Sequence, residues 1–201
     1  MTQPRFEAAI AAFDAANAQD PHKEAANGTA HSKELLYAQR MTDMQERYAP
    51  EASEAVKLAV RAQHIERWKS PRDNFPMDRA GYLRWRTELY KFHAETAGNL
   101  MRHVGYDDEM IARVQAIISK KALKANPETQ QMEDVVGLVF LEHYLEPFTG
   151  QHPEYDEAKW IPILQKTWNK LSERAHAFVL AGRIKLPAAL VPLILKAVVH
   201  D

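Results

Sequence analysis

The segment VRAQHIERWKSPR, residues 60–72, concentrates side chains that can bind a ligand or take part in a reaction. His64 follows Arg61 by three residues and precedes Trp68 by four, so a helix would place all three on one face. An imidazole ionises near neutral pH, which suits a metal ligand or a general acid or base. The alternative is a core histidine whose ring is simply hydrogen-bonded to a neighbour, as most buried polar groups are.

Two further positions in predicted helices could contribute to a site. His93 lies in LRWRTELYKFHAETAGNL, where Arg86 and Tyr90 precede it on the same helical face. Asp134 precedes an apolar run in QMEDVVGLVFLEHY, so we expect its carboxylate to be at least partly buried. An unpaired buried charge is costly, and Asp134 therefore needs a metal, a cation or a hydrogen-bond donor. The candidate partners for an ion pair, which is as well supported as a metal, are Arg40, Arg61 and Arg86.

Arginine and aromatic residues alternate between the two histidines. Guanidinium groups suit phosphate or carboxylate, and indole or phenol rings suit a base or a sugar. A loop that Pro71 and Pro76 stiffen is a good place for an anion-binding edge. The alternative is that these side chains cover the surface and pair with nearby acids. The predicted substrate-binding residues are Arg67, Arg72, Arg86, Trp68 and Tyr82.

The composition excludes several classes of protein. A net charge of −1 over 201 residues gives no reason to expect a nucleic-acid partner. The absence of cysteine excludes disulfides, thiolate metal ligands and a cysteine nucleophile. No apolar run approaches the ~18 residues of a membrane helix, and no N-terminal signal region is found. We therefore expect a cytoplasmic protein with no membrane partner; a homo-oligomer stays open.

Hydrophobic spacing predicts one all-α domain of roughly eight helices that covers residues 1–201. Apolar residues recur at intervals of three and four, and only seven glycines are present. Residues 20–30, which contain Asn27-Gly28, and residues 72–78 are predicted to be loops. The expected helices cover residues 5–18, 32–48, 50–68, 79–104, 107–120, 128–147, 157–171, 172–181 and 187–199.

Several sequence motifs of this chain resemble those of a bacterial and fungal family known as domain of unknown function family 4202. The motifs, in order, are KELLYAQRM, RAQHIERW, GYLRWR, FHAETAG and QMEDVVGLVFLEHY. The resemblance covers roughly residues 3–180, which leaves 181–201 as a C-terminal helical extension. It brings no assigned activity.

More distantly, the same order of motifs resembles the HD-domain phosphohydrolases, which are helical bundles that hold a divalent metal with histidines and aspartates. Ile65 stands where those enzymes carry the aspartate of the His-Asp dyad, and Glu34 competes with His31 for the first polar position. Manganese, magnesium, iron and nickel are not distinguished by the resemblance. The metal ligands that it implies are His31, His64, His93 and Asp134, with His64 and Asp134 as the catalytic residues.

These features predict an HD-like, metal-dependent phosphohydrolase that acts on a small phosphorylated or nucleotide-like molecule. In that mechanism the metal activates water, and Arg67, Arg72 and Arg86 neutralise the phosphate. The alternative is a non-catalytic HD-like module with a degenerate metal site, which binds an anionic ligand or a protein without turnover.

Overall fold

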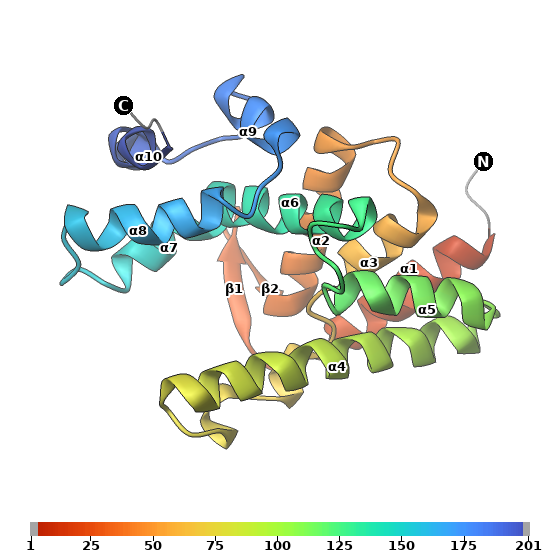
Figure 1. Ribbon diagram of the computed structural model, residues 1–201. Helices are drawn as coiled ribbons and strands as arrows, with labels where there is room; N and C mark the ends of the chain where they lie inside the picture. Colours follow the sequence, from red (N-terminus) through yellow and green to blue (C-terminus); the bar gives the residue numbers. More distant parts are fainter. Residues whose placement is uncertain (1–3, 199–201) are drawn as a thin grey trace. The chain divides into compact units, whose positions relative to one another are not determined.

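The computed structural model describes residues 4–198, and that part of the chain is mostly helical (Figure 1). It contains ten α-helices, one short π-helix and one two-stranded antiparallel hairpin. The predicted all-α fold class is confirmed, with the hairpin as the exception. The chain divides into two compact units, with the boundary after Met132. Within residues 4–198, no helix combines the length and the apolar character that a membrane crossing requires.

The first unit is organised around α3, in which most side chains are buried. Helices α1, α2 and α5 pack against α3, and α4 lies along α5 (Figure 1). Residues 72–78 form a short connection before α4, as predicted. The bounds are α1 Pro4–Asn17, β1 Lys23–Ala26, β2 Thr29–Ser32, α2 Lys33–Tyr48, α3 Glu54–Ala62, α4 Arg79–His103 and α5 Asp108–Ile118.

The hairpin β1–β2 occupies the segment for which a loop was predicted, and that prediction was wrong. Asn27 has φ +51° and Gly28 has φ +75°, so both central residues of the turn are left-handed. Two such residues form the tight turn that matches the twist of a hairpin, and Asn-Gly is the sequence that favours it. The strands are only four residues long and lack alternating apolar residues, which is why hydrophobic spacing did not reveal them.

Helix α3 is shorter than predicted at both ends. It begins after Ser53, whose hydroxyl accepts a hydrogen bond from the backbone N–H of Val56 at 3.3 Å. It ends at Ala62, and four residues later Glu66 adopts the left-handed φ of +51° and its N–H donates to Asn17 Oδ1 at 3.0 Å. His64 therefore lies in a turn, and the prediction that it shares a helical face with Arg61 and Trp68 was wrong.

The second unit begins inside α6 and contains the remaining helices. The predicted helix 128–147 is interrupted by a π-helix at Phe140–Tyr144, where the backbone gains an extra residue per turn. Helices α8 and α10 pack against each other. The bounds are α6 Pro127–Val139, α7 Leu145–Gly150, α8 Glu157–Trp168, α9 Glu173–Leu180 and α10 Val191–Val198.

Asp134, on α6, is buried and bound to the start of α9. Its Oδ1 accepts from the backbone N–H of Ser172 at 2.8 Å, and its Oδ2 accepts from the Ser172 hydroxyl at 2.6 Å. The same hydroxyl accepts from the N–H of Ala175 at 3.3 Å, so Ser172 caps α9. The buried carboxylate thus has hydrogen-bond donors, as its burial required.

Replacing Asp134 by alanine should lower the free energy of unfolding by about 3 kcal/mol, because the N–H and the hydroxyl of the half-buried Ser172 both lose a charged acceptor. Ser172→Ala, which removes one of the two bonds and the cap, should cost about 1–2 kcal/mol. Urea unfolding measures both values, with the exposed neighbour Glu173→Ala as the control. An Asp134→Ala protein as stable as the control would show that these bonds contribute nothing.

Candidate functional site

Three segments of the first unit bring polar side chains together at what we call the His64–His93 cluster. The turn after α3 supplies His64 and Arg67, and the middle of α4 supplies His93. The first turns of α2 supply Glu34 and Tyr37. The cluster is defined by these five residues.

His64 is held on three sides by its neighbours. Its Nε2 accepts a hydrogen bond from Arg67 Nη1 at 2.8 Å, so the ring proton lies on Nδ1. Nδ1 faces Glu34, with 3.5 Å between it and Oε2. The Tyr37 ring stacks on the imidazole with a centroid distance of 4.2 Å and an angle of 18°. The Glu34 carboxyl, the His64 imidazole and the Arg67 guanidinium thus lie in a row. This arrangement fixes the tautomer of His64 and the position of the Arg67 guanidinium.

His93 presents a nitrogen without a partner. Its Nδ1 donates to the backbone carbonyl of Ile65 at 2.8 Å, which leaves the lone pair on Nε2. That Nε2 is buried and makes no hydrogen bond. The two imidazole rings have a centroid distance of 5.8 Å. Burial and the neighbouring His64 lower the pKa of His93 to about 3, so the ring is neutral at physiological pH.

Positive charge surrounds the His64 ring. Burial lowers the pKa of His64 well below its usual value. The charges that lower it further are, in order, those of Arg67, Lys120, Arg86 and Lys33. The His64 side chain is 23% exposed, so solvent reaches this charged region.

Two of these cations lie against tyrosine rings. Arg86 donates to the Tyr90 hydroxyl and, at 3.3 Å, to the hydroxyl of Tyr82, whose side chain is exposed. The Lys120 ammonium lies 5.7 Å from the centroid of the Tyr90 ring. Lys120 has a left-handed φ of +55° in the turn after α5, an unusual conformation for a lysine.

Glu34 is a carboxyl that can exchange its proton near neutral pH. Burial raises its pKa to about 7, against the opposing positive charges of Arg67 and Lys33. Its backbone N–H donates to Asp20 Oδ2 at 3.0 Å, which fixes the start of α2 beside the cluster. A carboxyl with this pKa suits general acid or base catalysis.

Arg72, predicted to bind substrate, holds the connection before α4. It donates to the carbonyls of Phe75, Pro76 and Asp78 at 3.0, 2.6 and 3.2 Å. Its guanidinium also lies 5.9 Å from the centroid of the Trp85 ring. These contacts show a structural role for Arg72, and its role toward a substrate stays a prediction.

The tryptophan beside the arginines is Trp85. The Arg67 guanidinium lies 5.1 Å from its ring centroid, and its indole N–H donates to the carbonyl of Ser70 at 2.9 Å. Trp68, the predicted ring, is half-buried in the short 3₁₀ turn Arg67–Lys69. Spacing on an assumed continuous helix favoured Trp68, and the early end of α3 removed that basis.

The four predicted metal ligands are spread over both units. His31 is on β2, opposite Glu24 in the hairpin register. His64 and His93 belong to the cluster, and Asp134 lies in the second unit with Ser172 as its partner. Within residues 4–198, no group of three or more histidine, aspartate or glutamate side chains is arranged to hold a metal ion. The residues do not fit a multidentate centre as they stand, and the metal set stays a prediction.

The arginines that were candidate partners of Asp134 have other acceptors. Arg61 makes a bidentate ion pair with Asp14, in which Nε and Nη2 each lie 2.7 Å from a carboxylate oxygen. Arg40 pairs with Glu24 in the hairpin. Arg86 binds the two tyrosine hydroxyls described above.

Sequence reasoning anticipated Glu34 as the polar contact at the start of α2. It missed three residues in or near the His64–His93 cluster, namely Tyr37, Lys33 and Lys120. Tyr37 lies three residues after Glu34, a spacing that places both on one helical face. Lys33 directly precedes Glu34. Lys120 was explained only by the helix dipole of α5, and no local pattern indicated that the chain turns it toward α4.

The chain belongs to a family described as domain of unknown function (DUF4202), whose model matches residues 7–194. The match continues beyond residue 180, so most of the predicted C-terminal extension is part of the family. Neither curated proteins nor solved structures provide a match.

Replacing Glu34 by glutamine should change how stability depends on pH. A carboxyl whose pKa rises from 4.5 to about 7 on folding binds more protons in the folded state. Its contribution is therefore fully present below pH 4.5 and is lost as the pH rises through 7. Relative to wild type, Glu34→Gln should gain up to about 3 kcal/mol between pH 5 and pH 8.

Denaturant unfolding of both proteins at the two pH values measures this gain. Glu46→Gln, at an exposed position on the same helix, is the matched control. A wild type and a Glu34→Gln variant with parallel pH profiles would contradict the raised pKa.

Proposed function

We propose that this protein binds a small phosphorylated molecule at the His64–His93 cluster. The observation that carries the proposal is that Arg67 Nη1 lies 2.8 Å from His64 Nε2, at two neutral imidazoles on which Lys120, Arg86 and Lys33 also act with positive charge. Burial raises the pKa of the Glu34 carboxyl, which is in contact with His64, to about 7, so at pH 7 this carboxyl offsets only part of the positive charge. A partly exposed concentration of positive charge attracts an anion, and guanidinium groups match phosphate geometry.

The arrangement of Arg67 favours phosphate recognition over a purely structural role. Its guanidinium is oriented by His64 Nε2 and supported by the face of Trp85. One Nη hydrogen bond to His64 leaves further donors of the planar fork for an acceptor. An arginine that is already oriented loses less entropy when it binds an anion.

The exposed ring of Tyr82 extends the proposal to nucleotide-like ligands. Its centroid lies 6.0 Å from the Arg86 guanidinium, so a ring for stacking and a group for phosphate lie side by side. Glu34, in contact with His64, would supply an acid or base if the ligand reacts.

Calorimetric titration with adenosine monophosphate tests the binding proposal, with uncharged adenosine and inorganic phosphate as comparators. Arg86→Gln and Lys120→Gln should each weaken binding of adenosine monophosphate about tenfold, because each removes one cation near the phosphate. Lys121→Gln, the exposed neighbour of Lys120, is the control and should bind as the wild type does. A wild type that binds neither phosphate compound at millimolar concentration, or equal losses in all three variants, would overturn the proposal.

An HD-like, metal-dependent phosphohydrolase is the second candidate, and the buried Nε2 of His93 without a partner favours it. A neutral imidazole with one nitrogen fixed by a backbone carbonyl is the usual state of a metal-bound histidine. Within residues 4–198 no group of three ligands is arranged around a metal position, and His64 Nε2 accepts from Arg67, so this candidate requires a rearrangement that releases His64 and completes the ligand set.

Metal content separates the two candidates, provided that the protein is purified without a histidine tag. For the hydrolase, a divalent metal should copurify, manganese should raise the melting temperature of a chelator-treated sample, and His93→Gln should abolish that rise. His103→Gln, at an exposed position of the same helix, is the control. A melting temperature that changes with neither chelator nor metal would exclude the hydrolase candidate and leave only the binding proposal.

A further inference from the structure

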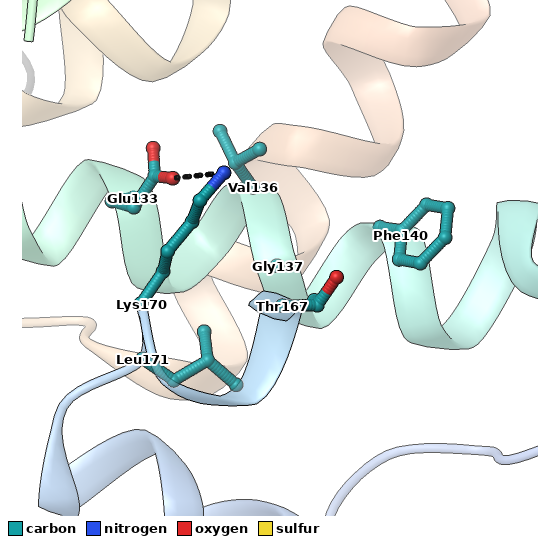
Figure 2. A pocket seen from close by; sticks show the side chains of 7 residues that line it. All are labelled: Glu133, Val136, Gly137, Phe140, Thr167, Lys170 and Leu171. Atoms are coloured by element: carbon teal, nitrogen blue, oxygen red, sulfur yellow. Dashed lines mark ion pairs between the residues drawn. The ribbon is translucent and has the colours of Figure 1, made fainter. Parts of the chain in front are cut away.

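A pocket of about 180 Å³ lies in the second unit, between the later part of α6 and the end of α8 (Figure 2). Its walls are mainly apolar. They come from α6, from the first residue of the π-helix, and from the end of α8 with the turn that follows it. The apolar lining residues are Val136, Gly137, Phe140 and Leu171. None of the residues of the His64–His93 cluster belongs to it.

The absence of a side chain at Gly137 is part of how this pocket is built. A Cβ at Gly137 would lie 2.5 Å from Leu171 Cδ2, so only glycine lets the Leu171 side chain approach the helix this closely. Phe140 lines the pocket and is also the first residue of the π-helix. Single π-helical turns inside α-helices occur frequently at functional sites, because the extra residue changes where side chains point.

An ion pair lies at the edge of the pocket. Lys170 Nζ is 4.0 Å from Glu133 Oε1, and Figure 2 shows the lysine side chain extended toward that carboxylate. The Glu133 side chain is 6% exposed, whereas that of Lys170 is 58% exposed. The ammonium has three N–H donors and is the accessible member of the pair, so it can also bind an anion from solution.

We infer that this pocket binds a small molecule with an apolar body, of about the size of one aromatic ring, and one carboxylate. The volume supports the size of the body, since an engineered apolar cavity of about 150 Å³ in another protein accommodates benzene. The apolar walls favour the ring, and Lys170 favours the carboxylate. The Glu133 carboxylate is buried and already pairs with Lys170, so the accessible charge at the edge is that of the lysine, and we expect cationic ligands to bind more weakly than anionic ones.

Benzoate, benzyl alcohol and benzylamine are suitable probes, because they combine the same ring with a negative, a neutral and a positive group. Titrations of the full chain followed by amide chemical shifts should show benzoate binding about tenfold more tightly than benzyl alcohol, and benzylamine binding most weakly of the three. The largest shifts should fall on residues 133–140 and 167–171. Shifts elsewhere, or equal affinity for all three probes, would overturn the inference.

Two variants assign the roles of the lysine and of the cavity. Lys170→Gln should weaken benzoate about tenfold and leave benzyl alcohol unchanged, whereas Lys166→Gln, an exposed position on α8, should change neither. Val136→Phe, which fills the pocket, should abolish binding of both. Should Val136→Phe fail to fold by circular dichroism, intermolecular NOEs from the benzoate ring to Val136 and Leu171 methyl groups in the wild type decide the same point. Equal effects of Lys170→Gln and Lys166→Gln would contradict the assigned role of Lys170.

Discussion

The hydrogen bond from His93 Nδ1 to the carbonyl of Ile65 is the constraint on which the candidate site depends. It is available only because α3 ends at Ala62 and frees the next carbonyls from helical pairing. The same bond directs the His93 proton to Nδ1 and so leaves the Nε2 lone pair buried without a partner. One backbone carbonyl thereby sets the tautomer of His93 and ties α4 to the turn that carries His64 and Arg67.

Most of the helical architecture could be predicted from the sequence, because the spacing of apolar residues is a local property that each helix displays on its own. The turn after α3 could not, since Glu66 in that turn donates its N–H to Asn17, a residue 49 positions earlier in the chain. Asn27-Gly28 is a strong turn signal for the hairpin, but its two strands, KEAA and TAHS, are short and carry no apolar alternation that supports it.

The candidate site shows the same division between local and long-range information. His64, His93, Arg67 and Arg86 could be selected by residue type, and Glu34 as a polar contact could be anticipated. Their mutual geometry required the turn after α3, and the charge of Lys120 near His64 required the fold of α5 against α4. Asp134 illustrates the limit most clearly, because its burial was expected while its partner, Ser172, lies 38 positions away and caps another helix.

The π-helix at Phe140–Tyr144 makes the length of this segment matter as much as its composition. The extra residue is an insertion in an otherwise α-helical path from α6 to α7. Deletion of one residue there would let a regular α-helix continue while the residues after it keep their facing, because the π-turn accommodates one extra residue. Leu145, only 1% exposed, would keep its buried position, and the change would be confined to the side chains of the π-helix. In an alignment of relatives, we expect a gap at these five positions to mark chains in which the wall containing Phe140 is built differently.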